Sequence, residues 1–184
     1  MDNITSQPAH LRLAIAPGVS SSQLSALLAL QRAEEPEVSI AFFEVAGDEL
    51  LDGLREGRYD VGMSLQGASD PALETQPLWI EHMAVAIPLR LPLLEQASLT
   101  IADLQNYPIF RWEAETCSSL DRRLLARLPA DPQNLQYVTS FEMMALWVSA
   151  GYGVGVSAQS RIKHAPGWGV SMRPLDDGPY EIVA

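Results

Sequence analysis

Three consecutive serines in the first half of this 184-residue chain have the residue type and position to hold an anion. Ser20, Ser21 and Ser22 follow the apolar run 11–16 and precede an apolar helical pattern. Hydroxyls and free backbone N–H groups at the positive end of a helix attract negative charge. Plain helix capping is the alternative. We expect at least one of these serines to line a ligand pocket.

Asp48 and Gln66 stand in the same relation to the next two apolar runs of the first half. A carboxylate at position 48 would disfavour an anionic ligand at that wall by Coulomb repulsion, or would cap the helix that follows. We favour the cap. Gln66 can both donate and accept a hydrogen bond, and its alternative is a solvated loop.

Arg111 and Trp112 follow an apolar strand pattern in the second half. Arg111 could clamp a carboxylate with two parallel hydrogen bonds, and Trp112 could form an aromatic wall. A surface arginine stacked on tryptophan is the alternative. Ser140 and Phe141 open a later apolar helix, where Ser140 is expected to cap and its neighbours to contact ligand. Trp147, at helical spacing, is expected in the core.

No set of residues typical of catalysis or metal binding is visible. His10, His82 and His164 are far apart, and Cys117 has no partner cysteine and no evident base. The glycines of 151–155 run from a helix into a strand, the reverse of the dinucleotide fingerprint. We therefore expect no metal, no cofactor and no enzymatic activity.

Alternating strand and helix patterns in the first half must position these residues. Pro36 and Gly57 are natural helix ends, and a further long strand closes this half. The expected strands are 11–16, 38–45, 59–65 and 78–87, and the expected helices begin near Ser22 and Asp48. Such a sheet places a binding crevice at the carboxyl ends of its strands.

The second half repeats this alternation. It begins with a short helix at 99–104, with Thr100 as N-cap and Asp103 completing a capping box. The remaining strands are expected at 107–110, 136–138, 154–156 and 180–183, and the helices at 118–128 and 141–148. Crossings near 83–88 and 180–183 would join two α/β units.

Composition restricts the class of partner. The net charge is −11, and the 12 basic residues are scattered, so this segment alone is a poor DNA binder. One cysteine favours a reducing compartment. The first eight residues lack the pattern of a signal peptide, and no apolar run approaches the ~20 residues of a membrane span. We expect a cytoplasmic protein.

The order and spacing of several short motifs over residues 11–184 carry a family resemblance. The chain resembles the effector-binding domain of LysR-type transcriptional regulators, although Ala158 stands where many members have proline. The most characteristic motif is Ser149-Ala150-Gly151-Tyr152-Gly153-Val154-Gly155. The other motifs are Leu11-Arg12-Leu13, Glu35-Pro36-Glu37-Val38, Glu56-Gly57-Arg58-Tyr59-Asp60-Val61-Gly62, Ser69-Asp70-Pro71, Val85-Ala86-Ile87-Pro88 and Leu99-Thr100-Ile101-Ala102-Asp103-Leu104.

The resemblance implies an α/β fold of two Rossmann-like lobes, of the type II periplasmic-binding-protein kind, with the ligand cleft between the lobes. It divides the chain into a lead-in at 1–10, lobe I at 11–84, lobe II at 85–179 and a return crossing at 180–184. The family's N-terminal helix-turn-helix and C-terminal helix are expected to be absent. The resemblance also favours the pocket for Arg111 and Trp112.

The function implied is sensing of a small-molecule effector, with Arg111 and the serines suggesting a carboxylate. DNA would be bound only through the missing N-terminal domain. A homodimer is implied, in which Ser22–Arg32 and Val38–Val45 pack against the partner's second lobe, with a larger oligomer for the full-length protein. A stand-alone solute-binding protein and an enzyme on the same scaffold are the alternatives.

Overall fold

One mixed sheet of eight strands runs through the whole molecule. The computed structural model describes residues 9–19, 22–65, 70–115, 117–128 and 134–184. The strand order is β2-β1-β3-β8-β4-β7-β5-β6. The strands are β1 (His10–Ile15), β2 (Ser39–Glu44), β3 (Val61–Leu65), β4 (Pro77–Pro88), β5 (Ile109–Trp112), β6 (Leu135–Val138), β7 (Val154–Ala158) and β8 (Val170–Val183).

Helices connect the parallel strands of this sheet. Four short 3₁₀ helices stand among five α-helices in the described part of the chain. The α-helices are α1 (Ser22–Glu34), α2 (Gly47–Arg55), α3 (Ser118–Arg127), α4 (Phe141–Ser149) and α5 (Gln159–Lys163). The 3₁₀ helices are η1 (Pro17–Val19), η2 (Pro92–Glu95), η3 (Ile101–Leu104) and η4 (Pro166–Trp168).

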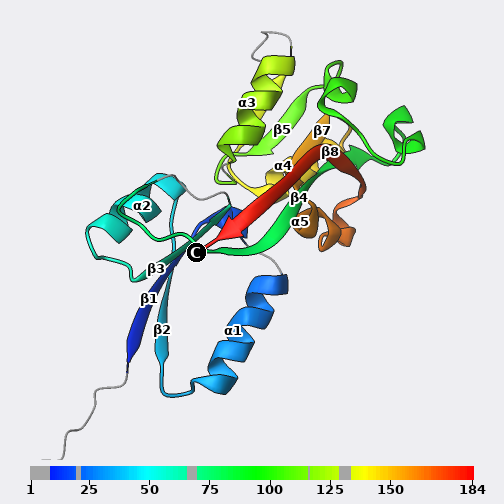
Figure 1. Cartoon of the computed structure of the whole chain (residues 1–184). Helices are drawn as coiled ribbons and strands as arrows, with labels where there is room; N and C mark the ends of the chain where they lie inside the picture. The colour runs from blue at the N-terminus through cyan, green and yellow to red at the C-terminus, as the bar shows by residue number, and fades with distance from the viewer. Residues whose placement is uncertain (1–8, 20–21, 66–69, 116, 129–133) are drawn as a thin grey trace, which may run out of the picture.

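Two lobes share the sheet, as Figure 1 shows. Lobe I holds the parallel strands β1, β2 and β3 with α1 and α2, and lobe II holds the parallel strands β5, β6 and β7 with α3, α4 and α5. The long strands β4 and β8 pair antiparallel with each other and pass through both lobes. This architecture is the expected two-lobed α/β fold.

The pairing of the crossing strands β4 and β8 is irregular at two points, one between Pro77 and Trp79 of β4 and a larger one further along. Pairing shifts between His82 and Ala84 of β4, because β8 inserts extra residues between Pro174 and Pro179. Gly178, within that insertion, has φ of 101°, which a residue with a side chain rarely adopts. On one side of this bulge β4 continues beside β7 in lobe II, and on the other side β8 continues beside β3 in lobe I.

Each lobe has a core that its sequence pattern explains. In lobe I, Ala14, Leu50 and Tyr59 are buried between β1 and α2. In lobe II, α3 buries Leu120 and Leu124 against the strands, while α4 buries its face on Met144 and Val148. Burial of the apolar side chains on one face of each helix stabilises its docking on the sheet.

Most predicted elements are confirmed, three expectations are corrected, and one helix was not predicted. Asp48 is not the N-cap of α2, because Ala46 holds that position and Asp48 lies inside the first turn. The last strand is much longer than 180–183, since β8 starts at Val170 and its Pro and Gly residues sit at irregular points. The helix α5 was not expected after β7. Trp147 is 37% exposed, so it does not belong to the core.

Among the described residues, no helix is both long enough and apolar enough to cross a bilayer.

Candidate functional site

A cavity of about 310 Å³ lies between the two lobes. It opens at the carboxyl ends of β1, β2 and β5, where loops of an α/β sheet commonly bind ligands. Its walls are mainly apolar and aromatic, with one basic and one acidic side chain. Lobe I contributes Ile15, Ala16, Pro17, Leu24, Phe42, Phe43 and Glu44, and lobe II contributes Trp112 and Arg161.

The lobe I wall is built where β1 and β2 end side by side. Ile15 pairs with Glu44 in the parallel register, so the ends of both strands reach the cavity together. The Phe43 ring also lies 5.2 Å from the ring of Tyr59, centroid to centroid, which fixes its position against the lobe I core. Glu44, at the end of β2, is exposed and supplies the negative charge of the cavity.

The lobe II wall is a tryptophan with an arginine stacked on it. The indole Nε1 of Trp112 donates a 3.2 Å hydrogen bond to the Thr139 carbonyl, which orients the ring. The Cζ atom of Arg161 lies 4.6 Å from the centroid of the Trp112 ring. A guanidinium over a tryptophan face is a favourable cation–π pair. Trp112 is therefore placed at the cleft as the sequence suggested, with Arg161 rather than Arg111 beside it.

Arg111 does not face the cleft. Its side chain is fully buried in lobe II, and its donors are used within the protein. Nε donates to Asp121 at 2.9 Å, Nη1 to the Val156 carbonyl at 3.0 Å, and Nη2 to the Glu115 carbonyl at 2.9 Å. The carboxylate clamp expected of Arg111 is not available in this arrangement, nor is the surface stack. The residue instead joins β5 to β7 and α3.

Glu115 completes this buried network. One carboxylate oxygen accepts from Ser157 Oγ at 2.8 Å and from the Ala158 amide at 3.1 Å, and the other lies 3.3 Å from Arg111 Nη1. Burial alone would lower the pKa of Arg111, but the negative charges of Glu115 and Asp121 outweigh it, and the pKa is raised. Arg111 thus stays charged as a structural cation.

Ser140 and Phe141 have structural contacts. The Ser140 hydroxyl accepts a 3.1 Å hydrogen bond from the Met143 amide, so the expected N-cap of α4 is confirmed. Phe141 is buried in the core of lobe II, and neither residue is among those lining the cleft cavity. The centroid of the Phe141 ring lies 5.9 Å from Arg161 Cζ, so this ring contacts the arginine without lining the cavity.

Ser22 and Asp48 do not line the cavity either. Ser22 is exposed at the first position of α1 and its hydroxyl bonds to the Gln23 side chain at 3.2 Å. Asp48 is exposed, and one of its carboxylate oxygens accepts from the Glu49 amide at 3.0 Å. Ser20, Ser21 and Gln66 lie outside the described residues.

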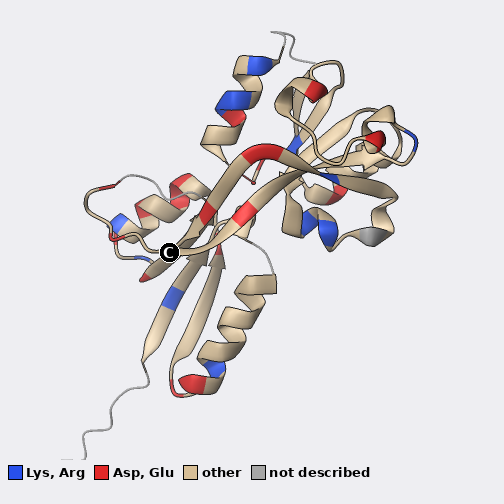
Figure 2. Cartoon of the chain, turned by 45° about the vertical axis from the view of Figure 1, so that its right-hand side comes forward, with Lys and Arg blue, Asp and Glu red and all other residues tan. Residues whose placement is uncertain are grey.

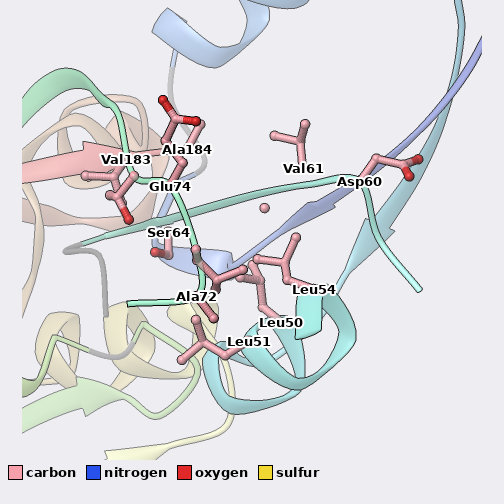
Figure 3. Close-up of a pocket in the computed structure, with 13 residues that line it drawn as sticks. Leu50, Leu51, Leu54, Asp60, Val61, Ser64, Ala72, Glu74, Val183 and Ala184 are labelled. Carbon is pink, nitrogen blue, oxygen red and sulfur yellow. The ribbon is translucent and has the colours of Figure 1, made fainter. Parts of the chain in front are cut away.

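A second cavity, of about 270 Å³, lies in lobe I and is shown in Figure 3. Leu50, Leu51 and Leu54 of α2 line one side of it, and Val183 and Ala184 line another. Asp60, Val61 and Gly62 of the family motif also line it, but none of the described candidate site residues does, and its described lining includes no helix or parallel strand of lobe II. The cavity between the lobes is therefore the better candidate for a site that responds to lobe movement.

Other chemistry is not assembled in the described part of the chain. No three His, Cys, Asp or Glu side chains there converge on a point that could hold a metal ion. Cys117 is buried, and burial raises the pKa of its thiol, which keeps it protonated and weakly reactive.

Arg161 and the Phe42–Phe43 pair were missed from the sequence. Like Arg111, these three residues lie at or just beyond the end of a strand that is parallel to its neighbour. Applying this criterion to 154–158 would have pointed to Arg161. Arg161 was missed because the helix α5, on which it lies, was not predicted.

The family profile described as the LysR substrate binding domain matches residues 6–183. The chain belongs to this family. This LysR substrate-binding domain is similar in sequence to curated bacterial transcriptional regulators. It is 28% identical over 155 residues to the probable cat1 operon transcriptional activator of Acinetobacter lwoffii, covering 80% of this chain and 51% of that protein. It is 24% identical over 125 residues to the HTH-type transcriptional regulator SsuR of Burkholderia cenocepacia, covering 67% and 41%.

Solved structures show the same LysR-type fold. The effector-binding domain of BenM, with its effector benzoate, has a TM-score of 0.82 at 22% identity, covering 97% of this chain and 84% of that one. The reduced OxyR regulatory domain of Pseudomonas aeruginosa has a TM-score of 0.78 at 20% identity, covering 96% and 88%. This LysR substrate-binding domain spans about half or less of the length of its curated relatives.

Proposed function

We propose that this domain senses a small-molecule effector in the cavity between its lobes and transmits binding to an N-terminal helix-turn-helix domain of a LysR-type regulator. The observation that carries the proposal is the composition of that cavity. Both lobes supply its walls, so a ligand there interacts differently with open and closed arrangements. Differential affinity for two arrangements is what a ligand needs in order to shift between them.

A carboxylate is the effector class that we propose. The walls offer aromatic and aliphatic surface for the body of such a molecule, and Arg161 is the basic side chain that lines the cavity. Benzoate, the effector of the BenM domain, is a carboxylate of this kind, although the likeness between the two chains shows the fold alone.

A thermal-shift screen of the purified domain against small metabolites tests the proposal. An effector at 100 times its dissociation constant should stabilise the fold by about 2.7 kcal/mol. Hits are repeated on Trp112→Ala, which removes a cavity wall, and on Trp168→Ala, a tryptophan that does not line the cavity. Loss of the shift in the first variant alone supports the proposal. Hits that survive Trp112→Ala unchanged, or that the domain turns over, would argue against it.

DNA contact is proposed only through the N-terminal domain of the regulator. The domain carries a net charge of −11, and Figure 2 shows acidic positions on both lobes and along the crossing strands, with basic positions scattered. Such a surface repels DNA phosphates. A regulator that acts on DNA in a bacterium works in the cytoplasm, which is the compartment this proposal implies.

A homodimer is also proposed, supported by two exposed apolar surfaces. The helix α1 buries none of its residues, and Leu27 and Leu30 on it are 37% and 53% exposed. In lobe II, Leu146 and Trp147 of α4 are 51% and 37% exposed. Two copies packed antiparallel would bring the lobe I surface of each onto the lobe II surface of the other, with two-fold symmetry.

A further inference from the structure

Arg161 is the charged side chain that reaches from lobe II into the cavity and on to lobe I. It stands on α5, directly after β7, and its side chain is 15% exposed. Its Nη2 donates to the carbonyl oxygen of Pro17, which follows β1 in lobe I. Its Nε lies 3.4 Å from a carboxylate oxygen of Glu115. The guanidinium therefore bonds to both lobes at once across the proposed ligand site.

One nitrogen of this guanidinium has no acceptor among the residues that the structure describes. Arginine has five N–H donors, and Nη1 of Arg161 donates to none of the described residues. The Pro17 carbonyl is a single neutral acceptor. A carboxylate can accept two parallel bonds from the guanidinium, and charge-assisted bonds are roughly twice as strong as neutral ones. A carboxylate that enters the cavity can therefore displace the Pro17 carbonyl from the guanidinium of Arg161.

The base of Arg161 is held firmly in lobe II. The hydroxyl of Ser160 donates a 2.6 Å hydrogen bond to Glu81, and the Ala158 amide donates to Glu115 at 3.1 Å. Both carboxylates are buried, so the start of α5 has little freedom to follow a ligand. When the guanidinium exchanges its partner, lobe I, which carries Pro17, therefore moves more than α5 does.

We propose that Arg161 is the residue that recognises the effector carboxylate and couples its binding to lobe position, by exchanging the Pro17 carbonyl for that carboxylate. This inference rests on the proposed sensing function. It also narrows the ligand class. Glu44 stands in the opposite wall, so a second carboxylate on the ligand would be repelled. The site fits a monocarboxylate with an apolar body.

Affinity measurements test the recognition step with defined probes. Hexanoate and cyclohexanecarboxylate are compared by calorimetry with their primary amides and with adipate, a dicarboxylate. We expect each acid to bind at least tenfold more tightly than its amide or than adipate. Arg161→Gln should remove at least tenfold of the acids' affinity and leave the amides unchanged. Lys163→Gln, which removes an exposed charge from the same helix, should match the wild type.

Distances between the two lobes, measured with and without ligand, test the coupling step. Spin labels are placed at Glu74→Cys in lobe I and Arg122→Cys in lobe II, both exposed, while Cys117 is buried. Dilution with unlabelled protein restricts the signal to distances within one chain. We expect the empty Arg161→Gln variant to show a broader distance distribution than wild type, and hexanoate to shift the distribution in wild type but not in this variant.

Three results would overturn the inference: equal affinity for acids and amides, full affinity in Arg161→Gln, or the same distances in Arg161→Gln and wild type. If instead a neutral or cationic metabolite binds and Trp112→Ala abolishes its binding, the sensing function stands and only the role of Arg161 fails. If no metabolite binds at all, the sensing function fails, whatever the spin-label distances show.

Discussion

The hydroxyl of Ser160 donates a 2.6 Å hydrogen bond to the buried carboxylate of Glu81, joining α5 of lobe II to β4 at the point where that strand leaves lobe I. The Ser160 amide, at 3.4 Å, and the His82 amide, at 3.0 Å, donate to the other oxygen of the same carboxylate. This bond therefore fixes the helix that carries Arg161 to one of the two strands that connect the lobes.

Ser160→Ala should lower the free energy of unfolding. The substitution removes a donor from a buried carboxylate, and an unsatisfied buried group costs about 1–3 kcal/mol. Urea unfolding followed by circular dichroism measures the loss. Ser98→Ala, at an exposed serine, is the control and should stay within about 0.5 kcal/mol of wild type. Equal effects of the two substitutions would contradict the role given to Ser160.

Arg111→Met should destabilise the domain strongly. Removing one partner of a buried ion pair typically costs about 3–5 kcal/mol, because Glu115 would stay buried without its cation. The matched control is Arg122→Met, an exposed arginine on α3. Urea midpoints and slopes separate the two. A midpoint for Arg111→Met close to that of the control would show that the network contributes little to stability.

Gly153→Ala and Gly47→Ala should have opposite effects. A Cβ at position 153 would lie 2.2 Å from the backbone oxygen of Pro108, so the strands must separate, at a cost of about 1–3 kcal/mol or more. A Cβ at position 47 meets nothing within 4 Å, and alanine stabilises a helix by about 0.5–1 kcal/mol over glycine. Melting temperatures of both variants test this pair. A lowered melting temperature for Gly47→Ala would contradict it.

The pair of Arg12 and Asp60 should make stability depend on pH at acidic values. Hydrogen bonds from the Arg12 side chain and backbone lower the pKa of Asp60 from 3.8 to about 2. A depressed folded-state pKa stabilises the fold above the unfolded value, and this contribution is lost as pH falls through the folded value. The advantage of wild type over Asp60→Asn should therefore be complete above about pH 4 and fade towards pH 2.

Thermal melts of both proteins across that range measure the effect. Arg12→Ala should weaken this pH dependence, because it deletes the guanidinium that shifts the carboxyl and leaves only the bond from the backbone amide of residue 12. An advantage that stays constant down to pH 2 would mean that the pair does not act through ionisation of Asp60.

Leu30→Glu and Trp147→Glu should each shift the domain from dimer to monomer. A charge in the middle of either apolar surface must be desolvated on association, which is unfavourable. Sedimentation velocity over micromolar concentrations measures the mass. Leu125→Glu is the control, since Leu125 is 64% exposed on α3, away from both surfaces. Dissociation by Leu125→Glu, or a wild-type monomer throughout, would contradict the proposed dimer.

Local interactions explain what could be predicted from the sequence. The Asp103 carboxylate accepts from the Thr100 amide at 2.7 Å, as the capping box predicts, and Gly57 and Gly151 end helices with positive φ. Each of these features depends on residues only a few positions apart. The alternation of strands and helices likewise follows from local apolar patterns, and so the lobes could be anticipated.

The positions of Arg111 and Arg161 depend on contacts with residues that are distant in the sequence. Arg111 is buried because β7 lies beside β5 and brings the Val156 carbonyl to it, a contact over 45 positions. Arg161 reaches the cleft because α5 turns back towards Pro17, over 144 positions. Neither of these two contacts can be predicted from a local sequence pattern. The sequence predicted an arginine in the lobe II wall of the cavity, and the structure places Arg161 there rather than Arg111.

The order of strands has a consequence for folding during synthesis. In lobe I, β3 is bordered by β8, whose last residues are at the end of the described chain. The first lobe to leave the ribosome therefore has an unpaired strand edge until the last strand arrives, and its completion waits for all of lobe II. Long-range pairings of this kind are slow to form and expose the chain to aggregation. We expect a nascent chain of this domain to expose the β3 edge until lobe II has been synthesised.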